Sequence, residues 1–270
     1  MNTLYNTLYM ASSVTITIHT HNEEKNIEAC IESACLLSNH IQVVDMMSTD
    51  KTVSIAKKLG VEVFSFPYSQ YVEPSRQFGI TKAKTNWVFI LDADERMTLF
   101  LAEEIKSAIQ NPQYSYYKIA RKNIFNITWL KHGGWWPDYQ IRLINKKFFK
   151  KWPKEIHSTP LIEGTGGFLK QPLLHYFHGD LEQMVNKTVI FEDIESDLLY
   201  KAGKNASSVI FLRKFLGELY RRLFRHFGFL DGTIGIIESI YQAFSKTITY
   251  LFLYEKHKKK SPCLPAGRSL

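Results

Sequence analysis

Short apolar runs alternate with helix-like segments over the first 110 residues, and this alternation constrains the fold more than any other feature. The apolar runs, which are rich in Val, Ile and Phe, cover residues 14–18, 41–44, 61–66 and 87–91. The segments with apolar residues at helical spacing cover residues 27–34, 52–59, 75–83 and 98–109. This order predicts a doubly wound α/β fold with a mostly parallel sheet.

Polar side chains follow three of these runs, at the point where each predicted strand ends. They are Thr20, His21, Asn22 and Glu23 after the first run, Asp45 after the second, and Asp92 and Asp94 after the fourth. The carboxyl ends of parallel strands meet at one edge of the sheet, and ligands of doubly wound folds bind there. The sequence therefore predicts a polar and acidic binding site at this edge.

Two of these carboxylates, Asp92 and Asp94, are one residue apart. Side chains on a strand alternate with a period of two, so both carboxylates are expected to point the same way. Mg²⁺ and Mn²⁺ prefer oxygen ligands, and a bound cation would act as a Lewis acid toward a departing diphosphate. The alternative is that Asp94 caps a helix and Asp92 is solvated.

The motifs at these strand ends, taken in order, resemble those of family 2 glycosyltransferases, which have a GT-A fold. Residues 91–95 (LDADE) resemble the DxD motif of that family. Residues 20–24, 43–52 and 75–79 resemble its T-Y-N-E-E, V-V-D-S-G-S-T-D-x-T and Q-R-N-x-A/G motifs. The resemblance is closest to the bacterial subgroup that includes lipopolysaccharide core glucosyltransferases. It implies a GT-A catalytic domain over residues 13–180, followed by a helical extension, and a nucleoside-diphosphate sugar as donor, with a UDP-sugar favoured.

The resemblance also implies which residues bind the nucleotide sugar. Asp45 would contact the base or ribose, or else cap the next helix. His21 stands where the family has an aromatic residue that packs on uracil, and its imidazole would stack there. Arg76 would contact the diphosphate, because a guanidinium pairs well with phosphate oxygens, or else form a surface ion pair with Glu73. Asp92 would reach the ribose or share the metal ion.

A divalent metal ion, Mg²⁺ or Mn²⁺, is implied as cofactor, with Asp94 as its main ligand. Residues 155–158 resemble the subgroup's E-V-H-E, so His157 is a candidate further ligand, although a lone histidine is more often structural. Two departures from the family pattern are Ser158, where an acid is expected, and Met46-Met47, where Ser-Gly is usual.

The acceptor side is implied by residues 131–143, which resemble the subgroup's G-G-W-Y-P-D-Y-Q-x-R-L. Trp135 and Trp136 would offer flat apolar surface to a sugar ring. Asp138 is the candidate base of an inverting transfer, or else it caps a turn or only binds an acceptor hydroxyl. Gln140 and Arg142 are expected on the same strand face as Asp138, toward the acceptor. His175 and His178 would line the same opening, or else serve in the core or a loop.

The positive charge of the chain is confined to its C-terminal quarter. Residues 201–270 hold 13 Lys and Arg against 4 Asp and Glu, whereas the first 200 residues hold 21 against 22. This distribution argues against a nucleic-acid binder and indicates a near-neutral domain with a basic extension. Over residues 209–225 apolar and cationic positions alternate at helical spacing, which is typical of a helix on an anionic membrane, or else of a helix packed on the domain with a solvated basic face.

The predicted organisation is a frayed leader over residues 1–12, a catalytic domain over 13–180, a basic helical extension over 181–255 and a disordered tail over 256–270. The function it implies is a metal-dependent inverting glycosyltransferase, cytoplasmic and peripheral on the inner face of the cytoplasmic membrane, that acts on a lipid-linked or lipopolysaccharide-core acceptor. The alternatives are a polyprenyl-phosphate sugar transferase and a non-catalytic sugar-nucleotide-binding protein.

Overall fold

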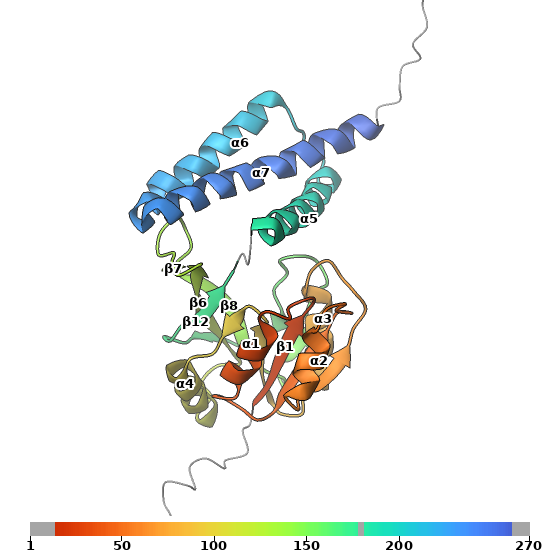
Figure 1. The fold of residues 1–270 in the computed structure, drawn as a ribbon, viewed down its shortest axis with the longest axis vertical. Coiled ribbons are helices and arrows are strands. Elements are labelled where there is room, and N and C mark those ends of the chain that lie inside the picture. The colour runs from red at the N-terminus through yellow and green to blue at the C-terminus, as the bar shows by residue number, and fades with distance from the viewer. Residues whose placement is uncertain (1–13, 178–180, 261–270) are drawn as a thin grey trace, which may run out of the picture. The chain divides into compact units, whose positions relative to one another are not determined.

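The computed structural model describes residues 14–177 and 181–260, which form two compact units (Figure 1). The described part of the first unit comprises residues 14–124 and 136–177, and that of the second comprises 125–135 and 181–260. The predicted leader and residues 261–270 of the predicted tail lie outside the described residues.

The first half of the first unit has the predicted alternation of strands and helices. Its elements are β1 (Val14–Thr20), α1 (Ile27–Ala34), β2 (Ile41–Asp45), α2 (Thr52–Lys58), β3 (Glu62–Ser65), α3 (Glu73–Lys82), β4 (Trp87–Asp92) and α4 (Leu99–Gln110). The four strands lie in the order β3-β2-β1-β4 and are parallel. Helix α2 is followed by Gly60 at a φ of +74°, the left-handed conformation with which helices commonly end.

The remaining strands of this unit extend the sheet beyond β4 in the order β8-β6-β12-β5. Strand β8 (Asp138–Asn145) runs antiparallel to both β4 and β6 (Tyr116–Phe125), whereas β12 (Leu173–Tyr176) runs parallel to β6 and antiparallel to β5 (Glu95–Arg96). The shorter strands of this unit are β9 (Phe149–Lys151), β10 (Leu161–Ile162) and β11 (Gly166–Phe168), whereas β7 (Thr128–Trp129) belongs to the second unit. As predicted, the described residues from 115 to 177 contain strands and loops without a helix.

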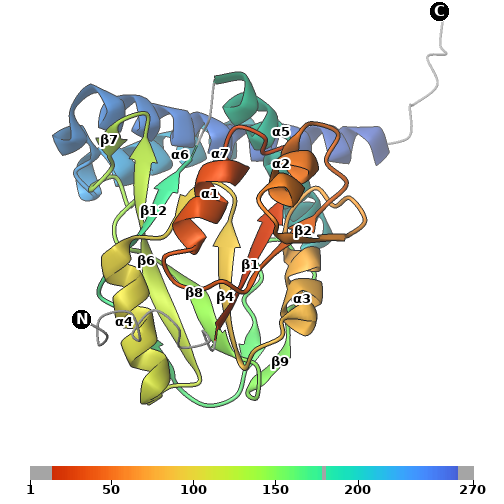
Figure 2. The same ribbon diagram turned by 60° about the horizontal axis from the view of Figure 1, so that its bottom comes forward.

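The hydrophobic core lies on both faces of the sheet, which is why β1 and most of β4 are buried along their length. On one face Ile16, Ile18 and Phe89 pack with residues of α1 and α4. On the other face Val88 and Ile90 pack with residues of α3 and with Trp152. Figure 2 shows β1 and β4 side by side within the sheet, with α1, α3 and α4 around them. This two-sided packing confirms the predicted doubly wound α/β fold.

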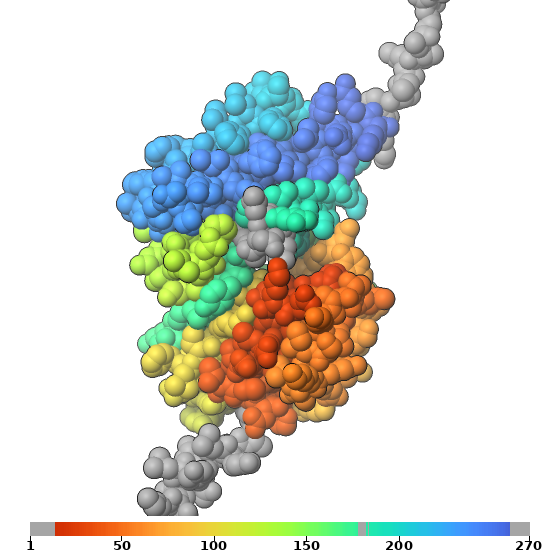
Figure 3. All heavy atoms as spheres, viewed as in Figure 1, coloured from red at the N-terminus to blue at the C-terminus, as the bar shows by residue number. Residues whose placement is uncertain are grey.

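The second unit is mainly helical and includes strand β7. It contains α5 (Leu181–Lys201), α6 (Ser208–Tyr220), a π-helical turn (Arg221–Arg225), a 3-10 turn (Gly228–Asp231) and α7 (Gly232–Lys260). Helix α7 packs against both α5 and α6, and α6 and α7 lie side by side in Figures 1 and 3. The predicted disordered tail therefore begins too early, because residues 256–260 continue α7. No helix in the described ranges has the length and hydropathy needed to cross a membrane.

Candidate active site

The carboxyl ends of β1, β2 and β4 meet at one edge of the sheet. In the strand register Thr20 lies beside Asp45, and His19 lies beside Asp92. The turn after β1 and the turn after β2 are tied together, since Asn22 Oδ1 accepts a hydrogen bond of 2.8 Å from the Thr49 amide. The polar residues that the sequence places at separate strand ends are thus neighbours.

Asp45 is buried, with 4% of its surface exposed, and its carboxylate accepts hydrogen bonds from the amide and hydroxyl of Ser48. It does not cap α2, because Asp50 accepts the bond from the Thr52 amide at the start of that helix. A hollow of about 410 Å³ adjoins Asp45 and is lined in part by Met47 and Thr49. This hollow lies where the nucleotide was expected.

Met46 and Met47, which stand where the family usually has Ser-Gly, differ in their surroundings. Met46 is buried, whereas Met47 is 58% exposed and has a φ of +59°, a conformation that glycine adopts most easily. The backbone therefore explains why a glycine is usual at position 47. The His21 ring lies 4.6 Å from the Tyr68 ring, and its Nδ1 donates a 2.8 Å hydrogen bond to the Met46 carbonyl.

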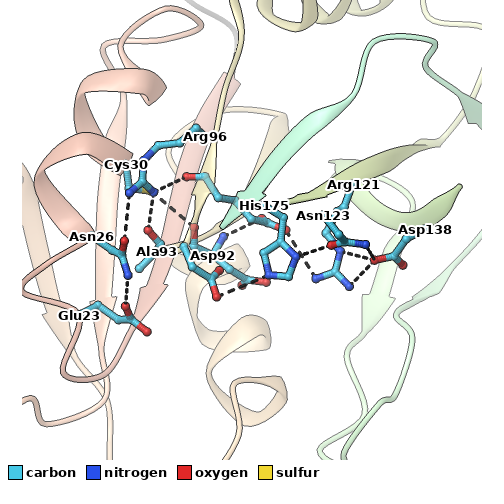
Figure 4. Close-up of polar contacts among 12 residues, drawn as sticks. Glu23, Asn26, Cys30, Asp92, Ala93, Arg96, Arg121, Asn123, Asp138 and His175 are labelled. Carbon is cyan, nitrogen blue, oxygen red and sulfur yellow. Dashed lines mark hydrogen bonds and ion pairs between the residues drawn. The ribbon is translucent and has the colours of Figure 1, made fainter. Parts of the chain in front are cut away.

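Thr20 is the last residue of β1, and Glu23 lies in the segment that follows it. Thr20 is buried, and its hydroxyl has no hydrogen-bond partner among the described residues. Glu23 Oε2 accepts a 2.8 Å hydrogen bond from Asn26 Nδ2, and Asn26 Oδ1 accepts one from Arg96 (Figure 4). Arg96 also donates to the Ala93 carbonyl, so the turn after β1 is linked to the turn after β4.

Asp92, at the end of β4, lies between two arginines. Arg76 Nη2 is 3.2 Å from both carboxylate oxygens, and Arg142 Nη2 is 2.7 Å from Oδ2. Burial of Asp92 opposes its ionisation, but the two guanidinium groups outweigh burial and hold its pKa well below the usual range. Arg76, for which a surface ion pair with Glu73 was the alternative to a diphosphate contact, is therefore paired internally with Asp92.

Arg142 does not reach the acceptor side as the sequence predicted. Its side chain is 1% exposed and pairs with both Asp92 and Glu95. The reason is that β8 lies next to β4, so that an inward-facing residue of β8 meets the end of β4. Glu95 is fully buried, and its Oε2 accepts a 3.0 Å hydrogen bond from the Asp92 amide, which fixes the turn between them.

Asp138, at the start of β8, is surrounded by three donors. Arg121 Nη2 lies 2.7 Å from Oδ2, Asn123 Nδ2 donates to the same oxygen at 3.2 Å, and Gln140 Nε2 donates to Oδ1 at 2.8 Å. Burial again opposes ionisation, but Arg121 and these hydrogen bonds outweigh it and lower the pKa of Asp138. Gln140 thus lies on the strand face of Asp138, as the alternation of the strand predicts.

Asp94 has different partners from Asp92. Strand β4 ends at Asp92 and residues 93–94 form a turn, so the alternation that predicted two parallel carboxylates does not extend to Asp94. His175 Nε2 lies 3.5 Å from Asp94 Oδ2, and its Nδ1 donates a 2.6 Å hydrogen bond to Asn123 Oδ1. Figure 4 shows this row, in which His175 and Asn123 connect the turn after β4 to Asp138.

The predicted metal ligands do not gather into a cluster. Within residues 14–177 and 181–260, no group of three or more His, Cys, Asp or Glu side chains lies close enough to hold a metal ion. His157 is exposed, and its amide donates to Glu73. His175 is the histidine that the structure places beside Asp94, whereas His178 lies outside the described residues.

Two residues of this site, Arg121 and Asn123, were missed from the sequence. They stand two apart on β6, as do Asp138 and Gln140 on β8, so polar residues at a period of two on both strands were the available signal. The two tryptophans of the predicted acceptor side belong to different units. Trp136 belongs to the first unit, and Trp135 belongs to the second.

The chain is similar in sequence to known glycosyltransferases over most of its length. Residues 15–175 match the sequence model described as Glycosyl transferase family 2. An uncharacterized glycosyltransferase of Rickettsia bellii is 29% identical over 274 residues, which cover 96% of this chain and 91% of that protein. The lipopolysaccharide core biosynthesis glycosyltransferase LpsC of Rhizobium meliloti is 24% identical over 255 residues, which cover 89% and 91%. Among solved structures, S. aureus TarS in complex with UDP-GlcNAc aligns with a TM-score of 0.49 at 14% identity over 91% of each chain.

Proposed function

Because the chain belongs to glycosyl transferase family 2, we propose that this glycosyltransferase moves a sugar from a nucleoside-diphosphate sugar, with a UDP-sugar favoured, to a lipid-linked or lipopolysaccharide-core acceptor. The observation that carries the proposal is the row of side chains that connects Asp94, through His175 and Asn123, to Asp138. Asp94 is expected beside the leaving diphosphate and Asp138 beside the acceptor. The row joins these two carboxylates in one network of polar contacts.

The nucleotide would lie along the ends of β1 and β2, against Asp45 and the residues from Thr20 to Glu23. Arg76 supports a diphosphate at the end of β4, since its Nε is buried and has no hydrogen-bond partner among the described residues. A buried donor without a partner is costly unless a ligand or water accepts its bond, and phosphate oxygens are suitable acceptors. Asp92 would act here by holding Arg76 in position.

The donor set at Asp94 fits a divalent metal ion. His175 donates its Nδ1 hydrogen to Asn123 Oδ1, and its Nε2 lies 3.5 Å from Asp94 Oδ2. Metal-binding histidines usually donate their other N–H to an oxygen in this way. Mg²⁺ commonly binds through one or two protein ligands together with substrate phosphates. Asp94 and His175 would therefore hold the ion, in place of the predicted His157, and the bound ion would neutralise charge on the leaving diphosphate.

Asp138 would serve as the base. The acceptor hydroxyl oxygen bonds to the anomeric carbon, the bond from that carbon to the diphosphate oxygen breaks with its electron pair, and the hydroxyl proton passes to Asp138. Direct displacement of this kind inverts the anomeric centre. Arg121 and Gln140 would orient the carboxylate and keep it ionised. The Asp138 carboxylate is a weak base, but it suffices. The acceptor hydroxyl becomes much more acidic once its oxygen has begun to bond to the anomeric carbon.

The acceptor and the location of the enzyme form the second part of the proposal. The relative from Rhizobium meliloti is named for lipopolysaccharide core biosynthesis, which supports a glycolipid or lipid-linked saccharide as acceptor. The basic charge of residues 201–270 supports a position on the inner face of the cytoplasmic membrane, which carries anionic lipids.

The test combines nucleotide binding with transfer. A thermal-shift screen of nucleoside-diphosphate sugars with Mn²⁺ should single out one donor, and that donor is then used with lipid extracts. We expect Asp94→Ala and Asp138→Asn each to abolish transfer, while Glu103→Gln at an exposed position of α4 leaves it intact. Retained transfer in Asp138→Asn would favour a polyprenyl-phosphate acceptor, which needs little help from a base. Nucleotide binding without turnover on any extract would favour a non-catalytic binding protein.

A further inference from the structure

The second unit exposes large apolar side chains in regular rows along two helices. On α6 and the turn that follows, they recur every three or four residues, and Val209 and Tyr220 are 74% and 64% exposed. This row consists of Val209, Leu212, Leu216, Tyr220 and Phe224. The row on α7 consists of Ile237, Ile240, Phe244, Leu251 and Tyr254. We call these ten residues the apolar face of the second unit.

Helix α7 buries polar side chains together with Ala243, Tyr250 and Leu253, and exposes a row of large apolar side chains. Its buried positions include Glu238, Ser239, Ser245, Thr247 and Thr249. Glu192 of α5 accepts hydrogen bonds from Ser245 and Thr249, so the polar side of α7 is engaged inside the unit. A helix in water normally buries its apolar side, so the outward rows indicate that this surface meets an apolar phase.

Cationic side chains accompany the apolar face. Arg213 and Arg225 are exposed on α6 and the turn after it, and Lys258 lies over the Tyr254 ring at 5.5 Å. In contrast, Arg221 and Arg222 are paired with Glu218. Exposed cations beside apolar side chains match anionic headgroups above acyl chains. In an association of two copies the same cations would face one another, which disfavours a second copy as the occupant.

The loop that carries Trp135 belongs to the same unit as these helices. Asp231 Oδ2 accepts hydrogen bonds of 2.8 and 2.7 Å from the amides of Lys131 and His132, and Oδ1 accepts one from the His132 ring. Arg222 lies over the Trp135 ring at 5.3 Å. At the tip of this loop Ile127 is 97% exposed. Residues 131–135, the first part of the predicted acceptor side, are thus anchored on the helices that carry the apolar face.

We propose that the apolar face docks on an anionic lipid surface, with α6 and α7 lying in the plane of the interface. The loop of residues 125–135 then moves with the docked helices, so that Trp135 is presented where a lipid-linked acceptor lies. The docking claim extends the membrane part of the proposed function and does not depend on sugar transfer, whereas the role of Trp135 rests on that function.

The test uses the full chain and sedimentation with vesicles. We expect binding to phosphatidylglycerol vesicles, weak binding to phosphatidylcholine vesicles, and a loss of about tenfold or more in affinity when Leu216→Glu and Ile240→Glu are combined. The matched control combines Leu99→Glu with Phe100→Glu, which places the same two charges at 52% and 68% exposed positions on α4 and should bind like the parent chain. Arg213→Glu with Arg225→Glu should weaken binding to anionic vesicles in a salt-dependent manner.

Each outcome decides the matter. Failure of the parent chain to bind phosphatidylglycerol vesicles overturns the proposal, and so does equal binding by the Leu216/Ile240 variant once its thermal transition shows that it is folded. If sedimentation velocity finds a dimer that this variant disrupts, and vesicles are not bound, the face covers a second copy instead. UDP binding with Mn²⁺ is measured on the same samples, so that a failure of the donor proposal is recognised separately.

Discussion

The guanidinium of Arg142 lies 2.7 Å from the carboxylate of Asp92, and the two residues come from adjacent antiparallel strands, β8 and β4. The same guanidinium contacts Glu95, so one buried cation joins both ends of the turn that contains Asp94. Arg121 continues the pattern, because it lies 3.8 Å from Glu95 and is paired with Asp138. Alternating charges therefore extend from the end of β4 to the candidate base.

Replacing Arg142 should destabilise the fold strongly. Arg142→Met leaves Asp92 and Glu95 without their shared cation, and breaking a buried pair in this way costs about 3–5 kcal/mol. The measurement is urea unfolding at pH 7. Adding Glu95→Gln to Arg142→Met should recover part of the loss, because one of the two buried charges is then removed. A free energy of unfolding within about 1 kcal/mol of the parent for Arg142→Met would contradict this account.

His19 should make stability depend on pH. It is buried, its Nδ1 donates to Ser75, and its Nε2 has no partner among the described residues, so a second proton on the ring would have no acceptor. Burial, with help from Arg76, lowers the pKa of His19 from 6.5 to about 3. The unfolded chain therefore binds a proton below pH 6.5 that the folded chain rejects. Stability from this group is fully present above pH 6.5 and falls as the pH drops toward 3.

Between these two pH values, the free energy of unfolding should fall by about 1.4 kcal/mol for each pH unit that the pH is lowered, as expected for one group. Urea unfolding of the parent and of His19→Gln is measured from pH 7.5 to 4.5. The difference between the two proteins gives the contribution of His19, because the titration of carboxylates is common to both. The variant should be less dependent on pH across this range. Identical pH dependence in the two proteins would rule out the buried neutral histidine.

The sequence predicted the strand ends better than it predicted the partners of the side chains on them. Thr20, Asp45 and Asp92 follow from the alternation of strands and helices, because parallel strands must end at one edge. The role of Arg142 did not follow, since it depends on β8 inserting between β4 and β6, a non-local pairing that local pattern does not encode. His175 was underrated for the same reason, because its partners Asn123 and Asp94 are 52 and 81 positions away in the chain.

The two candidate metal histidines can be separated by experiment. If Asp94 and His175 hold the ion, His175→Ala should lose most of the additional thermal stabilisation that Mn²⁺ gives in the presence of UDP. His157→Ala is the matched control, because the His157 side chain is exposed and the His157 amide donates to Glu73. The reverse result, with loss only in His157→Ala, would restore the ligand that the sequence indicated.

Arg121 should set the pH range in which Asp138 acts as a base. With Arg121 present the pKa of Asp138 is lowered, so the acid limb of the transfer rate should lie below the usual range of an aspartate. Arg121→Gln removes the cation, and the burial of Asp138 then favours the protonated form. The pKa rises, and the acid limb moves to higher pH. Arg121→Lys keeps a positive charge and should shift the limb less.

The measurement is kcat/KM for the acceptor as a function of pH, which reports the ionisation of the free enzyme. A merely structural role for Arg121 would lower kcat/KM by the same factor at every pH. A positioning role predicts that the activity of Arg121→Gln recovers toward the parent value as the pH is raised above the new pKa, while Asp138→Asn shows no such recovery. An unchanged acid limb in Arg121→Gln would separate Asp138 from the proton transfer, because the strongest cation acting on its carboxylate would then have no influence on the rate.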